Sequence, residues 1–515
     1  MSCTPEKPIS HSPLKLWSNN KKALNKIFFT MRLQSLPKHP PPPTQPPSPC
    51  FSPNPKPNKS HDFVFLPELV FDRTSLLSDD ILLKILSKLP ATQRNSNSLV
   101  SKRWLNLQGR LVRSVKILDW DFLVSGRLFF RFPNLVHVDL VQGSLLSPRN
   151  SGTLCSHKFV AFYVDTDTDT EPSRSLACER FLLSTDDVDS GLRNLANGCP
   201  NLRRLVVMNA SEMGLLSVAE ECPTLQELEL HKCNDQVLRG IAAFQNLQIL
   251  KLIANLDGIY TSGVSDVGLT ILAQGCKRLV KLELNGCQGS YDGIRAIGQC
   301  CQMLEELILA NHQMEDGWLS ALSFCENLKT LRFLSCKNID LNPGCHEHLG
   351  SCPTLERLHF EKCHLRDKQS IIALFIVCQG IRELIFRDCW GLNNEVFSVA
   401  SNLRRVKLLS LEGCSVLTTA GLEVVVLSWM DLQSLKVMSC NKIKDSEISP
   451  VLSYMFSTLE DLQWRPDTKS LLASNLGGTG MGKRGAKYFK KTCDWKSLPG
   501  SQPEMMLSFT FKNPL

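Results

Sequence analysis

Leucine-type residues recur along the chain in the pattern C-x-x-L-x-x-L-x-L-x-x-C. Two similar copies, CPTLQELELHKC at Cys222–Cys233 and CPTLERLHFEKC at Cys352–Cys363, start 130 residues apart. The first leucine-type position of the pattern falls at Leu135, Leu202, Leu225, Leu247, Leu279, Leu304, Leu328, Leu355, Ile381, Val406, Leu432 and Leu459. From Leu279 onward the steps are 24 to 27 residues, so the chain contains an internal repeat.

Each repeat predicts one strand followed by one helix. The L-x-L alternation places leucines on one face of a short strand, and later stretches such as SDVGLTILAQGC and DKQSIIALFIVC have helical spacing. Asp266 and Asp367 lie near the expected helix starts, where acids interact favourably with the helix dipole. One such unit cannot bury its own apolar face, whereas stacked copies can. The pattern therefore predicts a curved solenoid with parallel strands from about Phe132 to Asp467.

Two long steps interrupt the rhythm. The step from Leu135 to Leu202 is 67 residues and contains VDTDTDTEP, for which we expect a disordered surface loop at about 144–184. The step from Leu247 to Leu279 is 32 residues, which indicates an insertion of about six around NLDGIYTSG.

A segment with helical periodicity precedes the repeats, reading LLSDDILLKILSKLPATQRNSNSLVSKRWLNL from 76 to 107. Ser78 is a candidate N-cap, and Pro90 ends the first helix. One helix face carries Leu82, Ile85, Leu86 and Leu89, and a second pattern carries Val100, Trp104 and Leu107. About thirty residues cannot bury this much apolar surface alone. We expect the solenoid, a partner or both to cover it.

Charge and composition add little about partners. Residues 1–60 contain nine Lys/Arg and one acid, and this difference equals the net charge of +8, so the remaining chain is neutral overall. The basic balance is therefore weak evidence for nucleic-acid binding, and none is expected. No apolar run is long enough for a membrane helix, and no secretory signal is recognisable, which leads us to expect a protein of the cytoplasm or nucleus without membrane contact.

The 21 cysteines fit the repeat rather than a disulfide framework or a metal site. Without a signal peptide, reduced thiols are expected, and no C-x-x-C pair occurs. Fourteen cysteines occupy the entry and exit positions of the pattern: Cys199, Cys222, Cys276, Cys301, Cys325, Cys352 and Cys378, then Cys233, Cys287, Cys336, Cys363, Cys389, Cys414 and Cys440. A thiol is small, buries easily and donates weakly, so we predict buried structural cysteines.

These residues resemble two known families. The repeats, over about Phe132 to Asp467, resemble the cysteine-containing class of leucine-rich repeats. The helical segment resembles the F-box, which docks on a Skp-type adaptor, at Leu77, Asp80, Ile81, Leu82, Ile85, Leu86, Leu89, Pro90, Leu99, Val100, Lys102, Arg103 and Trp104. It departs from the motif at Ser78, where proline is usual, and in the polar TQRNSN. The combination resembles the F-box/leucine-rich-repeat family, and the long proline-rich leader and the reduced thiols resemble its plant members in particular.

The resemblance implies a fold, a domain order and a function. The expected order is a disordered basic, Pro-rich tail (1–70), an all-α F-box (71–115), an α/β leucine-rich-repeat solenoid (116–467) and a basic tail (468–515). The implied function is substrate recognition for a cullin-type (SCF) ubiquitin ligase, through an adaptor, a cullin and a RING protein, with no catalytic residue, cofactor or metal in this chain. The implied adaptor-binding residues are Leu77, Ile81, Leu82, Ile85, Leu86, Leu89, Pro90, Leu99, Val100 and Trp104.

The C-terminal GGTGMGKR, residues 477–484, is a near match to a phosphate-binding loop. Arg484 stands where a magnesium-binding hydroxyl is required, and no strand–loop–helix context surrounds the segment, so we interpret it as part of a basic tail.

Strand residues between the leucines are expected on the concave face. They comprise nine acids and eight bases, a mixture that suits a protein or peptide better than a polyanion. The predicted substrate-binding residues are Glu227, Glu229, Lys281, Glu283, Arg332, Arg357, His359, Glu383 and Arg387. The plain alternative is that these side chains only keep the array soluble.

Two further interpretations remain open. A hormone or small-molecule co-receptor of the same architecture could use Arg332, Arg357 and Arg387, on consecutive repeats, as an anion subsite, although Glu361 and Glu383 would oppose it. Alternatively, a repeat scaffold could have an F-box that no longer binds adaptor.

Overall fold

The computed structural model describes residues 73–145, 154–155, 160–161, 182–256, 260–261, 263–344 and 349–467. These residues all belong to one compact unit, Asp72–Leu515, and a second unit comprises Met1–Phe71. The described chain begins with a helical unit built from η1 (Arg73–Leu76), α2 (Asp79–Lys88), η2 (Ala91–Gln93), α3 (Arg94–Ser98) and α4 (Lys102–Leu111). As predicted, Ser78 caps α2, and the helix ends before Pro90.

A parallel sheet of thirteen strands follows. The strands are β1 (Ser114–Lys116), β2 (His137–Asp139), β5 (Arg204–Met208), β6 (Glu227–His231), β7 (Ile249–Ile253), β10 (Lys281–Asn285), β12 (Glu306–Ala310), β14 (Thr330–Leu334), β15 (Arg357–Glu361), β16 (Glu383–Arg387), β17 (Leu408–Glu412), β18 (Ser434–Met438) and β19 (Asp461–Arg465). Neighbours pair in parallel throughout, with Leu331, Leu358 and Leu384 in register. This confirms the predicted solenoid.

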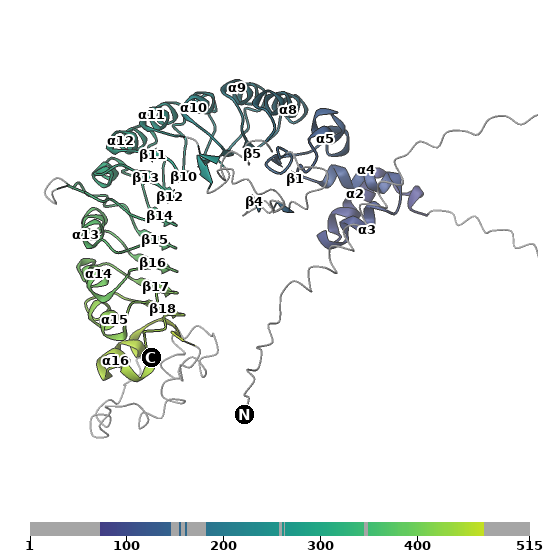
Figure 1. Cartoon of the computed structure of the whole chain (residues 1–515). Helices are drawn as coiled ribbons and strands as arrows, with labels where there is room; N and C mark the ends of the chain where they lie inside the picture. Colours follow the sequence, from purple (N-terminus) through teal and green to yellow (C-terminus); the bar gives the residue numbers. More distant parts are fainter. Residues whose placement is uncertain are drawn as a thin grey trace, which may run out of the picture. The chain divides into compact units, whose positions relative to one another are not determined.

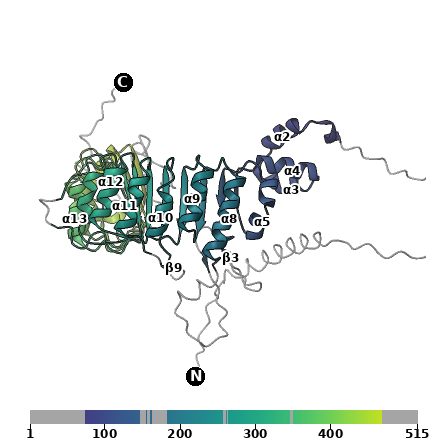
Figure 2. The ribbon, with the colours of Figure 1, turned by 90° about the horizontal axis from the view of Figure 1, so that it is seen from above.

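Helices cover the outer face of this sheet, and the other face of the sheet lines the inside of the solenoid (Figures 1 and 2). They are α5 (Trp120–Val124), α6 (Arg127–Arg131), α8 (Thr185–Gly198), α9 (Glu212–Glu221), α10 (Asp235–Ile241), α11 (Asp266–Gly275), α12 (Tyr291–Cys300), η3 (Trp318–Phe324), α13 (Lys368–Val377), α14 (Asn394–Ser398), η5 (Val399–Asn402), α15 (Thr419–Val426), η6 (Asp445–Glu447) and α16 (Pro450–Thr458). Both stretches predicted to be helical after their strands form α11 and α13.

Acids at helix starts also connect one repeat to the next. Asp235, at the start of α10, accepts from the backbone N–H of Ser265 at 2.7 Å. Asp266, at the start of α11, accepts from Ser290 N–H at 2.8 Å and from Gly293 N–H at 2.9 Å. Because these N–H groups begin the next helix, each carboxylate satisfies donors that the neighbouring helix cannot satisfy itself.

The core is one continuous apolar cluster that runs from Ile117 to Trp464. Near its middle, the ring of Phe360 stacks on Phe333 at 5.3 Å and on Phe386 at 5.1 Å between ring centroids. The fourteen repeat cysteines are all buried free thiols, which confirms their predicted burial.

The cysteines also act as weak donors to the backbone, as expected. The thiol of Cys222 donates to the carbonyl of Cys199 at 3.3 Å, and the thiol of Cys363 donates to that of Phe333 at 3.3 Å. Burial raises the pKa of the Cys222 thiol to about 12, so it stays protonated at neutral pH and is a poor nucleophile.

The structure departs from the predicted pattern at two places. The sheet begins at β1, before Leu135, although no leucine pattern marks that strand. The repeat between β14 and β15 has no helix in its described residues, 335–344 and 349–356. Within these residues, Gly344 has a φ of +81°.

The insertions and tails are described only in part. The insertion predicted after Leu247 contains an antiparallel pair, β8 (Asn255–Leu256) with β9 (Tyr260–Thr261). The predicted loop 144–184 contains another, β3 (Leu154–Cys155) with β4 (Val160–Ala161). VDTDTDTEP, residues 1–70 and GGTGMGKR lie outside the described residues. Among the described helices, none has the length and apolar content to cross a membrane.

Candidate functional site

The helical unit has a small core of its own. Leu82, Leu86 and Leu107 are 1%, 6% and 2% exposed and pack together. Leu77, Leu83, Leu89, Trp104 and Leu111 pack around them and are partly buried. The last residue of α3, Ser98, follows the polar TQRNSN stretch and attaches α3 to α4, because its hydroxyl donates to Gln108 Oε1 at 2.8 Å.

Arg103 fixes the start of α4 against the start of α2. Its Nε donates to Asp79 Oδ1 at 2.8 Å, and its other nitrogens donate to the carbonyls of Leu77 at 2.6 Å and Thr74 at 3.1 Å. The indole N–H of Trp104 donates to the Thr74 hydroxyl at 3.3 Å. One guanidinium thus satisfies three acceptors and orders the segment before α2.

Several apolar side chains of this unit remain at the surface. Ile81 and Ile85 on α2 are 47% and 41% exposed, and Leu99 and Val100 before α4 are 84% and 59% exposed. Leu76, outside the predicted set, is 75% exposed. Because Arg103 joins Asp79, Val100 and Ile81 lie at the same end of the unit.

The structure therefore divides the predicted adaptor-binding residues. Ile81, Ile85, Pro90, Leu99 and Val100 are exposed, and Leu77, Leu89 and Trp104 are partly buried. Leu82 and Leu86 are buried in the unit's own core, so their contact with an adaptor stays a prediction that the chain alone does not test. The helical periodicity identified apolar positions, but it could not show which of them face a neighbouring helix.

The nine predicted substrate-binding residues lie on β6, β10, β14, β15 and β16. They occupy strand positions that alternate with buried leucines and phenylalanines, so they share the inner face of the sheet.

Ion pairs join most of the charges on this inner face. Lys251 lies between Glu229 at 3.5 Å and Glu283 at 3.4 Å. The other pairs are Arg204–Glu227, Arg204–Glu229, Lys281–Glu306, Arg332–Glu306, Arg357–Glu383, Arg387–Glu361, Arg387–Glu412 and Lys436–Glu412. These pairs form a ladder of alternating charge across neighbouring strands.

Two groups on the inner face, Glu229 and His359, have lowered pKa values. Burial alone would raise the pKa of Glu229, but the hydrogen bond with His231 and the Lys251 ammonium lower that pKa to about 2. Burial, helped by the Arg332 charge, lowers the pKa of His359 to about 4, so its ring is neutral at physiological pH. The Nε2 atom of His359 and the Nε atom of Arg332 are buried and have no hydrogen-bond partner within the described part of the chain.

Arg332, Arg357 and Arg387, the residues of the alternative anion subsite, are each paired with a glutamate. Each lies within 4 Å of a glutamate carboxylate: Arg332 at 3.5 Å, Arg357 at 3.5 Å and Arg387 at 3.1 Å from its nearer partner. Because the positive charges of these arginines are already neutralised by glutamates, the structure adds no support for the co-receptor interpretation.

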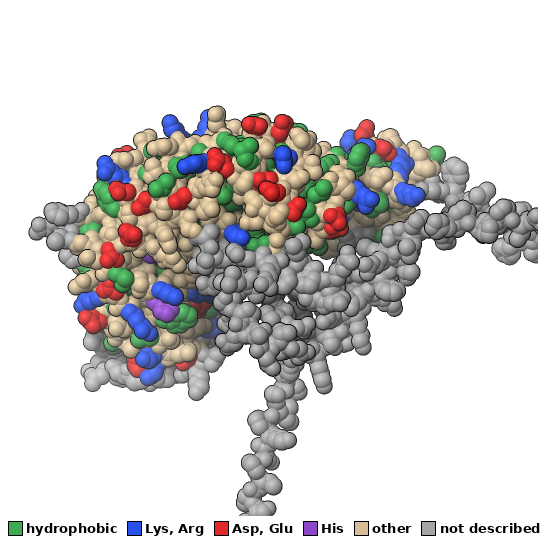
Figure 3. All heavy atoms as spheres, turned by 45° about the horizontal axis from the view of Figure 1, so that its top comes forward, with side chains coloured by type: hydrophobic (Ala, Val, Ile, Leu, Met, Phe, Trp, Pro, Cys, Tyr) green, Lys and Arg blue, Asp and Glu red, His purple; other side chains and the backbone are tan. Residues whose placement is uncertain are grey.

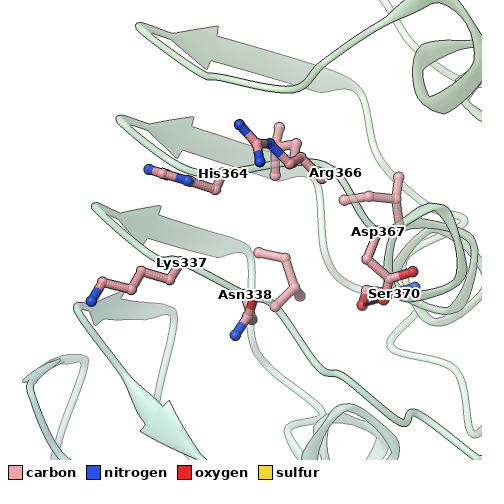
Figure 4. A pocket seen from close by; sticks show the side chains of 9 residues that line it. Lys337, Asn338, His364, Arg366, Asp367 and Ser370 are labelled. Carbon is pink, nitrogen blue, oxygen red and sulfur yellow. Dashed lines mark hydrogen bonds between the residues drawn. The ribbon is translucent and has the colours of Figure 1, made fainter.

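A cavity of about 340 Å³ is lined by residues that follow β14, by residues that follow β15, and by the first turn of α13. We call it the rim cavity (Figure 4); it is lined by Lys337, Asn338, Ile339, His364, Leu365, Arg366, Asp367, Ser370 and Ile371. The repeat pattern did not predict this cavity. The available signal was the break in helical spacing after Cys336, at LNPGCHEHLG.

No group of three or more His, Cys, Asp or Glu side chains in the described part of the chain is arranged to hold a metal ion. Outside the inner face, charges of both signs are interspersed over the helical outer side (Figure 3).

Comparison with known proteins supports the predicted F-box resemblance of the helical unit. Residues 74–113 match the F-box domain family. The chain is 34% identical over 132 residues to F-box protein SKIP19 of Arabidopsis thaliana, covering 24% of this chain and 43% of that protein. It is 24% identical over 180 residues to the putative RNA-binding protein EEED8.10 of Caenorhabditis elegans, covering 33% of this chain and 24% of that protein.

The chain therefore spans less than half of these relatives. Among solved structures, an internalin of Listeria monocytogenes matches at 15% identity and a TM-score of 0.32, covering 69% of this chain and 93% of that one. The mouse RP105/MD-1 complex matches at 20% identity and a TM-score of 0.35, covering 52% and 43%. At these scores neither likeness carries an argument, and the repeat fold rests on the strand topology described above.

Proposed function

Because the chain joins an F-box domain to a leucine-rich-repeat solenoid, we propose that it is the substrate receptor of a cullin-type (SCF) ubiquitin ligase. The F-box would bind a Skp-type adaptor and, through it, a cullin and a RING protein. The repeats would hold a protein target for ubiquitin-dependent degradation. The observation that carries this proposal is the exposure of apolar side chains on a helical unit whose sequence matches the F-box family.

The exposed apolar residues supply the driving force for adaptor binding. Ile81, Ile85, Leu99 and Val100 lie on a unit whose core, among its described residues, is formed by Leu82, Leu86 and Leu107. Apolar surface that a small unit cannot bury is a feature of protein–protein interfaces. Arg103 and the Ser101 cap, which accepts from Trp104 N–H at 3.2 Å, hold the exposed residues in place before binding, which lowers the entropic cost.

In this role the chain contributes proximity. Holding a target near a ubiquitin-charged enzyme raises the effective concentration of its lysines, and the bond-forming chemistry belongs to that enzyme. The stack of repeats provides an extended inner face for the target, with both signs of charge available.

Co-expression with a Skp-type adaptor tests the proposal. We expect the wild-type chain to copurify with the adaptor and Ile81→Glu with Ile85→Glu to lose it, because burying an unpaired carboxylate is costly. The matched control, Val424→Glu with Val451→Glu, alters apolar residues of α15 and α16 that are 62% and 57% exposed and should retain the adaptor. Absence of adaptor from the wild-type preparation would favour the scaffold interpretation instead.

Target accumulation provides the cellular readout. Proteins that accumulate when the Ile81→Glu/Ile85→Glu chain replaces the wild type, and that also do so when the proteasome is blocked, are candidate targets. If no protein responds to both treatments, the degradation role is rejected even though the adaptor binds.

A further inference from the structure

We propose that the rim cavity binds an acidic peptide segment in which an apolar side chain is flanked by carboxylates. The role of the cavity as the recognition site for a degradation target rests on the proposed function. Peptide binding itself can be measured separately. The cavity is lined by the loops that follow β14 and β15 and by the start of α13, not by the strand residues of the inner face (Figure 4).

Charge distinguishes the rim cavity from the inner face. Lys337 and Arg366 line the cavity and are exposed, and among the described residues neither has an ion pair or a hydrogen-bonded side-chain partner. The one carboxylate in the lining, Asp367, caps α13 by accepting from the N–H groups of Gln369 at 3.0 Å and Ser370 at 3.3 Å. The two cations are thus available to an incoming carboxylate, whereas Lys251 and Arg387 on the inner face already have partners.

The floor of the cavity is apolar. It is formed by Ile339, Leu365 and Ile371, which belong to the solenoid core and, at 4%, 1% and 2% exposed, leave little surface open. The accessible apolar surface lies at the side of the cavity. Beside it, the His364 ring meets the Trp390 ring edge-on at 4.8 Å, and Trp390 is 49% exposed. A mostly apolar concavity with a few placed polar groups is the usual form of a ligand site, and exposed tryptophan is enriched at interfaces.

The loops that carry these residues are held in register. Trp390 N–H donates to the Cys363 carbonyl at 2.9 Å, and Leu365 N–H donates to the Trp390 carbonyl at 2.7 Å. At Gly391, whose φ is +82°, an added Cβ would lie 2.5 Å from Arg366 Cγ. The glycine therefore lets the arginine side chain lie directly against the next repeat. A site held in its binding geometry loses less entropy when the ligand arrives.

An acidic peptide fits these features better than a nucleic acid does. A polyanion binds through a continuous run of cations, whereas this cavity has two, and the adjoining inner face alternates in sign. A peptide with two or three carboxylates around an apolar residue can pair with Lys337 and Arg366 without meeting the inner-face glutamates.

Fluorescence anisotropy on the full chain tests the inference. The probe is a fluorescein-labelled peptide with four glutamates around a central leucine, and the comparison peptide has four lysines instead. We expect the wild type to prefer the acidic peptide by at least about tenfold. Lys337→Glu with Arg366→Glu should abolish that preference, because two exposed charge pairs are together worth about tenfold.

The matched control is Lys407→Glu with Lys442→Glu, which makes the same change in net charge at exposed lysines outside the cavity. This control should retain the preference. Equal loss in both double variants, equal affinity for the two peptides, or binding of single-stranded RNA with the same dependence on Lys337 and Arg366 would overturn the inference.

Adaptor copurification, measured on the same preparations, separates the two proposals. If adaptor copurifies and the peptide preference is absent, the peptide site is rejected and the ligase proposal stands. If the preference depends on Lys337 and Arg366 and no adaptor copurifies, the peptide site stands and the ligase proposal is rejected.

Discussion

The F-box unit and the solenoid bury their apolar residues in different ways. In the F-box unit, three side chains form the core, and Ile81, Ile85, Leu99 and Val100 stay at the surface. In the solenoid, a single cluster runs from Ile117 to Trp464, because each repeat covers the next. Each repeat of the solenoid is stabilised by the repeats on either side of it, whereas the small F-box has apolar surface left for a partner.

The largest effect should come from the middle of the solenoid cluster. Phe360→Ala removes a ring that is 0% exposed and stacked on both sides, which should lower the free energy of unfolding by about 3–5 kcal/mol. Urea denaturation followed by circular dichroism measures this loss. Adaptor binding should persist because the F-box core is a separate cluster. Met430→Ala, at a side chain 92% exposed, is the control and should change stability little.

A similar but local effect is expected in the F-box core. Leu82→Ala should destabilise the helical unit by about 2–5 kcal/mol, enough to unfold a core of three residues. Hydrogen exchange should then show loss of protection at residues 73–111 and unchanged protection at 182–467. Adaptor binding would also fall, although Leu82 is not at the surface. Leu76→Ala, at a residue 75% exposed, should leave exchange unchanged, and equal exchange in both variants would contradict the buried role of Leu82.

The surface residues should show the opposite behaviour. Leu99→Ala with Val100→Ala should weaken adaptor binding by about 2–4 kcal/mol, roughly 30-fold to 1,000-fold, if the adaptor covers them. Stability should change by no more than about 0.5 kcal/mol, because these side chains are exposed in the free chain. Calorimetric titration with adaptor measures the affinity. A stability loss as large as that of Leu82→Ala would remove the distinction between core and surface.

The smallest effect concerns acidification of the solenoid. The pKa of His359 is about 4 in the folded chain and about 6.5 in an unfolded one, so the unfolded state binds the proton first. Its stabilising contribution is present above pH 6.5 and is lost as the pH falls toward 4. At pH 5 the loss should be about 1–2 kcal/mol. Urea unfolding at pH 7 and pH 5 should show a smaller pH effect in His359→Asn than in the wild type.

Repetition made much of the solenoid predictable from sequence. The L-x-L alternation of Leu358 and Phe360 determines which face of a strand is apolar, and a step of 24 to 27 residues requires that face to meet an equivalent neighbour. Parallel pairing and cysteine burial follow from the same stacking. Ser78 was also identifiable, because an N-cap depends only on residues within one helical turn.

Only the tertiary structure decided which F-box residues stay accessible and where the solenoid has free charges. Helical spacing places Leu82 and Ile85 on one broad face, but α4 packs over Leu82 and leaves Ile85 41% exposed. Likewise, the charged residues in the sequence did not show that Arg387 is paired, whereas Arg366 has no ion pair among the residues that the structure describes. Contacts between distant segments set both outcomes, because a periodic pattern specifies a direction from the backbone and not what lies in that direction.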